Sequence, residues 1–535
     1  MRLTTTTTTR NAVRLLRRHA STSAADDFDV VIVGGGPVGL ALASALASSP
    51  LVRQNLRVAL VEASDLDKVR NWSPEQGTFS NRASSLTHRS QTFLKGIRAW
   101  EHVDQQRTCP IENMQVWDGV SDARIHFPAS LLGLGAPGQG MARMTENLNL
   151  QRGLLRHLRT ISEVYLLDKT KVQSIARGEN AGWPLVQLDN GRVLRSRLFG
   201  RRGWFQLSPI VATMFHHPRG AFLGPHTTAY QRFLPTGPIA FLPLSPTASS
   251  LVWSTKPELA KALIASGPDT LQAMINAAFR LPNVSMEYLN KLILESPSPL
   301  SPSEIQAEIT WRERSHGIDA TSAFASAQQQ RGVPPADAEL LPPHVASIQL
   351  GSVASFPLRF NHTDSYLGEG EGARTVLVGD AAHTVHPLAG QGLNLGLGDV
   401  EVLACCIETA LLDGGDVGSR ALLPYASERY FANHKVMSVM DKLHKVYSTT
   451  LDPVVWARSV GVEVINELDS VKTALMMEGS GKAYGQGNFV WEAAAKGVEV
   501  VGSSAGMAKA VAEAAPGVLG WIARAVGNTV NSKRS

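Results

Sequence analysis

Cysteine is scarce in this chain of 535 residues, which contains only Cys109, Cys405 and Cys406. Three cysteines supply no disulfide framework, and none of them has the spacing of metal ligands. Apolar runs of 18 or more residues are also absent from the sequence, which excludes a membrane-spanning helix on length. The hydrophobic fraction of 44% and the charged fraction of 18% are those of a globular protein, and the length predicts more than one domain.

Acidic residues are missing from the first 24 positions, which hold five arginines and a row of threonines, Thr4 to Thr9. An arginine-rich, hydroxyl-rich and acid-free start is typical of a mitochondrial transit peptide, here residues 1–25. A disordered basic tail is the alternative. These five arginines equal the whole formal net charge of +5, so the remaining charges balance and no nucleic-acid partner is expected.

A glycine-rich turn follows the first apolar strand, which is expected at 29–33. It reads Gly34-Gly35-Gly36-Pro37-Val38-Gly39 and leads into an Ala/Leu-rich helix over 40–46. In this strand–turn–helix context the pattern G-x-G-x-x-G lets a pyrophosphate approach the helix N-terminus. A strand expected at 57–61 ends in Glu62, which is suited to accept a hydrogen bond from a ribose hydroxyl. Alone, this motif does not separate NAD from FAD.

A second glycine-rich run lies roughly 345 residues further along. A short buried strand is expected at 375–378, followed by Gly379-Asp380 and by a helical run through Leu412. A strand that ends in Gly-Asp places a carboxylate at the carboxyl edge of a sheet, where it can accept hydrogen bonds from sugar-like hydroxyls. The turn Gly390-Gln391-Gly392 lets backbone N–H groups approach a flat anionic ligand at the helix start.

Together the two runs resemble the FAD-binding motifs of the aromatic-ring flavoprotein monooxygenases. The second run, with His383, His386-Pro387 and Gly390 to Asn394, is most similar to the ubiquinone-biosynthesis branch of that family. The resemblance implies FAD as the cofactor. It also implies a cofactor site made of Gly34, Gly36, Pro37, Gly39, Glu62, Arg82, Asn147, Gly379, Asp380, Pro387, Gly390, Gln391, Gly392, Leu393 and Asn394.

Arg82 and Asn147 enter this set only through the resemblance. In the family an arginine at the position of Arg82 crosses the flavin near the pyrophosphate, whereas the plain alternative is a solvated surface arginine. Asn147 lies near the start of a helix expected from 145 to about 158, and the family places a polar residue at this position against the flavin. His383 and His386 are candidates for acid–base chemistry, but a hydrogen-bonded structural histidine is at least as reasonable. No catalytic residue and no metal site are therefore assigned.

Between and beyond the two runs the pattern changes. Residues 211–253 form short alternating segments separated by Pro and Gly, which predicts an antiparallel sheet. Residues 295–345 are rich in Pro, Ser and Gln and are interpreted as loops and an insertion. The Ala/Val/Gly-rich stretch 489–530 could cover the core, lie on a bilayer or meet a partner, and packing on the core is the more ordinary outcome.

These patterns predict an α/β fold. A Rossmann-like FAD-binding domain of the GR2, p-hydroxybenzoate hydroxylase-like type is expected to be interleaved with an antiparallel β-sheet substrate domain and followed by C-terminal helices. The expected division is a transit peptide over 1–25, an FAD-binding domain over 26–115, 145–203 and 352–425, a substrate domain over 116–144 and 204–351, and a C-terminal helical region over 426–535.

The resemblance implies a mitochondrial enzyme that hydroxylates C5 of a polyprenylated 4-hydroxybenzoate ring on the way to ubiquinone. In that branch reduced FAD and O₂ give a C4a-hydroperoxide, which transfers its distal oxygen to the phenol ring. The implied electron donor is a ferredoxin with its reductase. Other ubiquinone-biosynthesis proteins are implied as partners in a complex, together with a peripheral contact to the matrix side of the inner membrane.

One departure from the family pattern follows the strand expected at 192–198. The family carries a D-G-x-x-S-x-x-R motif there, whereas this chain reads Phe199-Gly200-Arg201-Arg202-Gly203-Trp204. Asp118-Gly119-Val120-Ser121 is no substitute, because its serine has the wrong spacing and it precedes the helix of Asn147. Two alternatives stay open: an NADPH-dependent hydroxylase of a soluble phenol, and an inactive member that holds FAD poorly.

Overall fold

The computed structural model describes residues 26–476. Short segments within this range are not described: 135–137, 162, 178–182, 196–207, 218–223, 297–299, 320–321, 326–338, 357–359, 371–372, 386–389, 470–471 and 474. The segment that departs from the family pattern and the C-terminal stretch 489–530 therefore lie outside the described residues, as does the predicted transit peptide.

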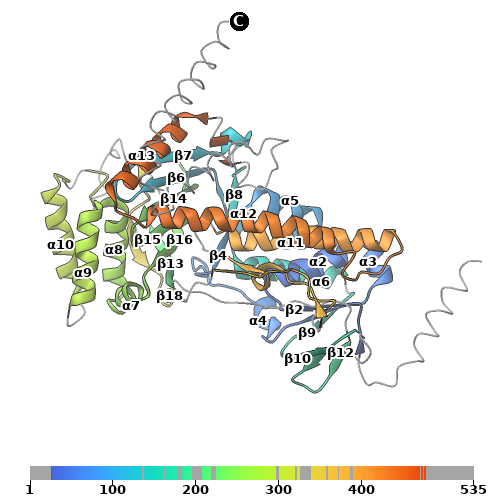
Figure 1. The fold of residues 1–535 in the computed structure, drawn as a ribbon. Helices are drawn as coiled ribbons and strands as arrows, with labels where there is room; N and C mark the ends of the chain where they lie inside the picture. The colour runs from blue at the N-terminus through green and yellow to red at the C-terminus, as the bar shows by residue number, and fades with distance from the viewer. Residues whose placement is uncertain are drawn as a thin grey trace, which may run out of the picture.

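A parallel sheet of three strands carries the first glycine turn. In order across the sheet the strands are β2 (Val30–Val33), β3 (Val58–Val61) and β9 (Val164–Leu167). Helix α2 (Pro37–Ser48) follows β2, and its Ala- and Leu-rich run from Leu40 to Ala47 is buried. This helix packs against α6 (Asn147–Ile161) and against the helix that follows the second glycine run (Figure 1).

Three smaller sheets surround this core. The first is β4 (Ala83–Thr87), β8 (Ala142–Glu146) and β5 (Thr108–Ile111); the second is β1 (Asp26–Asp27), β12 (Val193–Arg195), β11 (Pro184–Leu188) and β10 (Val172–Arg177); the third is β19 (Asn361–His362) and β20 (His383–Thr384). The short helices here are α3 (Pro50–Asn55), α4 (Leu66–Arg70) and α5 (His88–Gly96), with the 3-10 turns η1 (Ala99–His102), η2 (Gln105–Arg107), η3 (Ala129–Leu132) and η7 (Gly379–Ala381).

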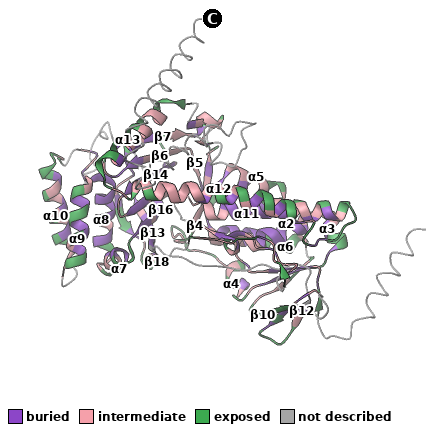
Figure 2. Cartoon of the chain, in the orientation of Figure 1, coloured by how far each residue is buried: buried purple, intermediate pink, exposed green. Residues whose placement is uncertain are grey.

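An eight-stranded sheet forms the second half of the molecule. Its strands in order are β17 (Val345–Ile348), β13 (Ser208–His216), β16 (Ala248–Thr255), β15 (Gly237–Pro243), β14 (Thr228–Leu234), β6 (Asn113–Asp118) and β7 (Arg124–Pro128), with β18 (Ala354–Ser355) also paired to β13. Every pairing is antiparallel except that of β14 with β6. The antiparallel sheet predicted for 211–253 is thus present, and Figure 2 shows its strands largely buried.

Helices α7 (Pro257–Ala265), α8 (Pro268–Arg280), α9 (Asn283–Glu295) and α10 (Pro302–Ser315) pack on this sheet and share its hydrophobic core. Helix α10 corrects the interpretation of 295–345 as loops. Its start is a capping box, in which the Ser301 hydroxyl accepts the Glu304 N–H and the Glu304 carboxylate accepts the Ser301 N–H. The signature Ser301-Pro302-Ser303-Glu304 is visible in the sequence, but the surrounding Pro and Ser residues obscured it.

Three long helices complete the described chain: α11 (Gln391–Leu412), α12 (Leu423–Tyr447) and α13 (Asp452–Glu467). Helix α12 runs beside α11 and leads to α13, which lies against β7 of the large sheet (Figure 1). The C-terminal helices therefore contact both halves of the molecule.

The strand expected at 375–378 is absent from the parallel sheet. Val376 forms only an isolated antiparallel bridge with Leu367. The Leu377 N–H donates to the carbonyl of Tyr366, and the Leu377 carbonyl accepts the Tyr425 hydroxyl, so that these backbone groups are satisfied without a neighbouring strand. The Gly-Asp turn is consequently placed by tertiary contacts instead of by the edge of a sheet.

The α/β fold class, with an antiparallel substrate sheet, is confirmed. The exact domain division remains a prediction. Strands β6 and β8 cross the predicted boundaries at 115 and 144, because β6 extends the large sheet from Asn113 and β8 joins β4 and β5 from Ala142.

Candidate functional site

The first glycine turn is shaped by close backbone contact. Gly34 has φ +110°, and a Cβ added at Gly39 would lie 1.9 Å from the Gly34 carbonyl oxygen, so a side chain at Gly39 cannot fit. By contrast, a Cβ at Gly34 or Gly36 would meet nothing within 4 Å. Gly36 is the N-cap of α2 and Pro37 its first residue. The turn therefore exposes the positive end of a helix to open space, as a phosphate site requires.

Glu62 follows β3 and turns its carboxylate toward this glycine turn. One oxygen accepts the Gly35 N–H, and the other accepts the Ser64 N–H at 2.7 Å. The side-chain amide of Gln151 in α6 donates to the Gly35 carbonyl at 3.1 Å. Glu62 is thus held beside the turn, with lone pairs left to accept a hydroxyl from a bound ligand.

The Gly379-Asp380 turn lies directly against the first glycine turn. Gly379 has φ +60°, and a Cβ there would come within 3.1 Å of a methyl group of Val38. Gly396 on α11 is equally close, because its Cβ would lie 2.7 Å from the other Val38 methyl. Two motifs that are far apart in sequence therefore converge on one valine. Asp380 is exposed at this junction.

The N-terminus of α11 supplies the Gly390-Gln391-Gly392-Leu393 segment. Gly390 is the N-cap with φ +60°, and the first turn contains neither an acidic residue nor a side-chain cap. A Cβ at Gly390 would lie 3.8 Å from Ser85 of β4. This helix end is thus a second positive terminus in the same region. Pro387 and His386 lie outside the described residues.

The Asn394 side chain is held by two residues of β4 and one of α5. Its amide donates to the Ser85 carbonyl at 2.7 Å and accepts the Thr87 N–H at 2.9 Å and the Ser90 hydroxyl at 2.8 Å. The side chain is buried and links β4 and α5 to α11. Asn394 therefore fixes the position of the α11 terminus, and its amide is occupied by protein partners.

Arg82 and Asn147 lie side by side where β4 and β8 pair. The Asn147 N–H donates to the Arg82 carbonyl at 2.9 Å, and the Asn147 side-chain oxygen accepts the Ser84 hydroxyl at 2.7 Å. The Arg82 guanidinium is exposed and lies 5.8 Å from the ring centre of Phe356. Both residues thus belong to the strand edge that also contacts Gly390.

Asp399 on α11, a residue that the sequence did not single out, holds the Gly-Asp turn through the Gly379 N–H. One of its carboxylate oxygens accepts the Gly379 N–H at 3.0 Å and pairs with His383 Nε2 at 2.6 Å. The other accepts Arg429 Nε at 2.8 Å and Asn433 Nδ2 at 2.9 Å. Asp399 is fully buried.

This cluster keeps Asp399 ionised. Burial alone would raise the pKa of the Asp399 carboxyl, but His383, Arg429 and Asn433 together hold that pKa below its usual value. A buried charge is tolerated only with such a complete set of partners. The Nε2 of His383 is engaged by the Asp399 carboxylate. Its Nδ1 is buried and has no hydrogen-bond partner in the described chain. Its geometry is that of a structural histidine.

The residues described so far fit an extended flavin dinucleotide. Two helix N-termini, a carboxylate at the end of β3 and an exposed aspartate border one region, and open space lies over the first turn. Positive helix ends suit the pyrophosphate and the electron-rich edge of a flavin, and the carboxylates suit sugar hydroxyls.

Comparison with known proteins agrees with this geometry. A family model described as an FAD binding domain matches residues 341–439, which contain the Gly-Asp turn and α11. The Schizosaccharomyces pombe protein named "Ubiquinone biosynthesis monooxygenase COQ6, mitochondrial" is 35% identical over 470 residues, or 83% of this chain and 90% of that protein. Proteins of the same name from Saccharomyces cerevisiae and Homo sapiens are 34% and 32% identical over 83% of this chain. They are covered over 92% and 90% of their lengths.

This chain belongs to that monooxygenase family. FAD is the cofactor of this monooxygenase, as the sequence resemblance implied, and the relatives' names agree with the mitochondrial localisation predicted from the N-terminus. None of the helices in the described part of the chain is long and apolar enough to cross a bilayer.

Solved structures share the monooxygenase fold. PqsL, a probable FAD-dependent monooxygenase from Pseudomonas aeruginosa, superposes with a TM-score of 0.52 at 20% identity, covering 82% of this chain and 99% of PqsL. The p-nitrophenol 4-monooxygenase PnpA from Pseudomonas putida gives 0.55 at 15% identity, covering 86% of this chain and 99% of PnpA. At these identities the likeness concerns the fold alone.

Proposed function

We propose that this monooxygenase hydroxylates C5 of a polyprenylated 4-hydroxybenzoate ring in ubiquinone biosynthesis. The convergence of the Gly34–Gly39 turn and the Gly379-Asp380 turn on Val38 is the observation that carries the proposal. Relatives that are 31–35% identical and named for ubiquinone biosynthesis supply the substrate class.

The residues would share the cofactor as follows. Gly34, Gly36, Pro37, Gly39 and Glu62 would bind the adenosine and pyrophosphate part, with Arg82 and Asp380 beside the pyrophosphate and ribityl groups. The first turn of α11, Gly390 to Leu393, would face the flavin ring with Asn147. Gly379, Pro387 and Asn394 would shape these segments. Bound FAD, once reduced, supplies the activation of O₂.

The protein would then orient the flavin ring and stabilise the negative charge on that ring. The N–H groups at the start of α11 would stabilise negative charge on the flavin ring, because they form the positive end of a 22-residue helix. Asp399 would keep the Gly379 backbone in its left-handed conformation, since it accepts the Gly379 N–H from below.

The finer partners are also part of the proposal. Electrons would come from a ferredoxin and its reductase, and the chain would act on the matrix side of the inner membrane within a biosynthetic complex. The surface around α12 and α13 supports a peripheral contact. Phe431 on α12, the N-cap Leu451 of α13 and Trp456 on α13 expose 71%, 57% and 68% of their surface. Such large apolar side chains could meet a bilayer or a protein of the complex.

A second candidate is an inactive member of the family that holds FAD poorly. It is favoured by the missing Asp-Gly motif after Leu198. An NADPH-dependent hydroxylase of a soluble phenol is the remaining alternative, and activity with NADPH alone and without a prenyl tail would favour it.

The test combines a spectrum with complementation. The purified full-length chain should show a flavin absorbance spectrum, and it should restore ubiquinone and the C5-hydroxylated intermediate in a strain that lacks its own C5-hydroxylase. Gly39→Val should abolish both, because its side chain collides with the Gly34 carbonyl, whereas the exposed Lys261→Gln on α7 should retain both. A colourless wild-type chain that gains no flavin on adding FAD, and that fails to complement, would establish the inactive alternative.

A further inference from the structure

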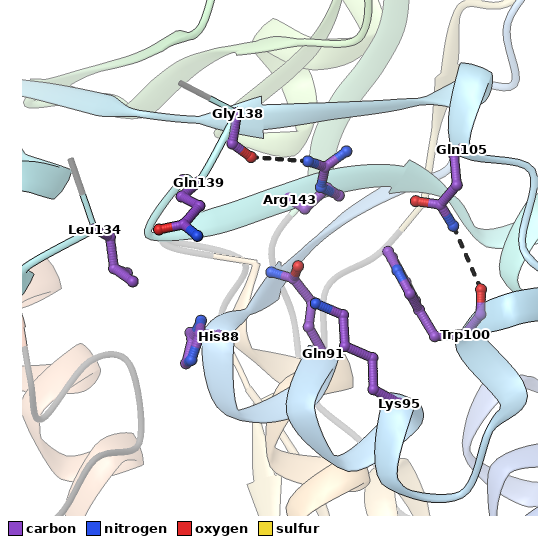
Figure 3. A pocket seen from close by; sticks show the side chains of 10 residues that line it. His88, Gln91, Lys95, Trp100, Gln105, Leu134, Gly138, Gln139 and Arg143 are labelled. Carbon is purple, nitrogen blue, oxygen red and sulfur yellow. Dashed lines mark hydrogen bonds between the residues drawn. The ribbon is translucent and has the colours of Figure 1, made fainter. Parts of the chain in front are cut away.

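A separate cavity of about 250 Å³ lies between α5 and residues 138–143, which lead into β8. It is bordered by one helix face, by the 3-10 turns η1 and η2 and by the start of β8 (Figure 3). The residues that line it are His88, Gln91, Lys95, Trp100, Gln105, Leu134, Gly138, Gln139, Gly140 and Arg143. None of the residues proposed to bind FAD is among them.

One wall is a single face of α5. His88, Gln91 and Lys95 are spaced three and four residues apart, so their side chains project from the same side of the helix. The helix begins at His88 after the N-cap Thr87, whose hydroxyl accepts the Ser90 N–H. The positive end of α5 is therefore at the His88 end of this wall.

The opposite wall is dominated by Arg143 on β8. Its guanidinium donates to the Thr108 hydroxyl at 2.9 Å and to the Gly138 carbonyl at 3.0 Å. Both acceptors are neutral, and a guanidinium has five N–H donors. In Figure 3 the side chains of Gln91 and Lys95 extend from α5 toward Arg143.

The two basic side chains of this cavity form no ion pair within the described chain, although Glu112 lies at its edge, where its carboxylate accepts the Gly138 N–H at 2.8 Å. No Asp or Glu is among the lining residues, and neither Lys95 nor Arg143 forms an ion pair in the described part of the chain. Neighbouring arginines differ in this respect, because Arg107 pairs with Glu146 at 2.6 Å and Arg152 with Asp104 at 3.5 Å. Two basic groups that line one cavity and have no ion-paired carboxylate favour an anionic ligand.

The remaining lining sets the shape of that ligand. The indole of Trp100 and the side chain of Leu134 provide apolar surface. Neutral hydrogen-bonding groups come from the Gln139 amide and from the Gln91 amide oxygen, since the Gln91 amide nitrogen donates to the Leu86 carbonyl at 3.0 Å. The volume is below the 300 Å³ or so at which pockets for drug-sized ligands begin, so a single ring and one charged group are the appropriate size.

We propose that this cavity binds a small ligand that carries one oxyanion, carboxylate or phosphate, on a flat apolar body. The oxyanion lies between Arg143 and Lys95, and the flat body lies against Trp100. The proposal is independent of the hydroxylase function, because it concerns binding at residues that the FAD site does not use.

Crystals of the full-length chain saturated with FAD test the location. Soaks with 4-bromobenzoate and with 4-bromophenyl phosphate should each place bromine, located by its anomalous signal, beside Trp100. The uncharged 4-bromobenzamide should leave the cavity without bromine. Bromine from both anions at other places only would overturn the proposal.

Titration calorimetry on the same FAD-saturated protein tests the chemistry. Arg143→Gln and Lys95→Gln should each weaken binding of the preferred bromo anion about tenfold or more, because each removes a charge-assisted contact. Lys261→Gln, an exposed lysine on α7, is the matched control and should change nothing. Inorganic phosphate, added as a competitor, should displace 4-bromophenyl phosphate more weakly than benzoate displaces 4-bromobenzoate, because phosphate lacks the flat apolar body. Equal affinities in wild type and in the Lys95→Gln/Arg143→Gln double variant would refute the assignment.

Discussion

Two fully buried aspartates, Asp399 and Asp118, are each paired with an arginine, one toward each end of α12. Asp399 joins Arg429 and Asn433 near the flavin-side helices, and Asp118 receives both Arg458 Nε and Nη2 at 2.8 and 2.9 Å beside the large sheet. Asp399 also holds a backbone N–H of the Gly-Asp turn, whereas the other partners of Asp118 lie in its own turn. The same ion pair can thus shape a binding loop in one place and anchor a helix in another.

Asp399→Asn should give the largest effect, because it acts on stability and on cofactor binding together. Loss of the charge leaves Arg429 buried without its counter-ion, which should lower the free energy of unfolding by roughly 3–5 kcal/mol. The weakened hold on Gly379 should raise the dissociation constant of FAD about tenfold or more in the molecules that remain folded. Chemical denaturation measures the loss of stability, and flavin titration at low temperature measures the FAD affinity. An unchanged FAD affinity would contradict the proposal that Asp399, unlike Asp118, shapes the cofactor site.

Arg458→Gln should destabilise the chain without weakening FAD. Asp118 would remain buried and unpaired, and the carbonyls of Val446 and Thr449 would lose the donors that Arg458 gives them, so a loss of about 3–5 kcal/mol is expected. The FAD dissociation constant of the folded protein should stay within about twofold of wild type. A flavin affinity that fell as far as in Asp399→Asn would show that both pairs act on the cofactor.

Acid should weaken both halves through buried histidines. Burial lowers the pKa of His157 in α6 to about 4 and that of His344 beside the large sheet to about 3. The unfolded chain takes up these protons near pH 6.5 while the folded chain does not, so stability should fall as the pH is lowered from 6.5 toward 4. His157→Gln and His344→Gln should each make this fall shallower in denaturation at several pH values. A slope unchanged by either substitution would contradict the expected burial.

Ser301→Ala should have the smallest effect. It removes the cap of α10, which lies far from the flavin turns on the outer layer of the large sheet, and a cost of about 1 kcal/mol is expected. FAD binding and turnover should be unchanged. Thr310→Ala, at the side of the same helix, is a suitable control for helix content by circular dichroism.

The glycine turns were predictable from sequence because their information is local. A strand, four glycines and a helix within twenty residues specify the turn at Gly34–Gly39, and α11 begins at the Gly390-Gln391 segment as expected. The roles of Asp399 and Asp118 were not predictable. Their partners lie up to 34 and 340 residues away, and only tertiary packing brings those side chains together.

The two corrections have equally specific causes. The segment 375–378 has the apolar pattern of a strand, but no neighbouring strand pairs with Leu377. The Tyr366 carbonyl and the Tyr425 hydroxyl form the hydrogen bonds of the Leu377 backbone instead. Helix α10 carries its capping box in four consecutive residues, but the Pro- and Ser-rich composition around that box is equally typical of loops.

Helix α12 sets the spacing between the Asp399–Arg429 pair and α13, which the Asp118–Arg458 pair holds against the large sheet. From Arg429 to Tyr447, whose ring stacks on Phe233 at 4.3 Å, an α-helix extends about 27 Å. One residue inserted within this span would rotate everything beyond it by about 100°. The two ends could then no longer dock at once, so the length of α12 should tolerate neither insertion nor deletion even where its surface tolerates substitution.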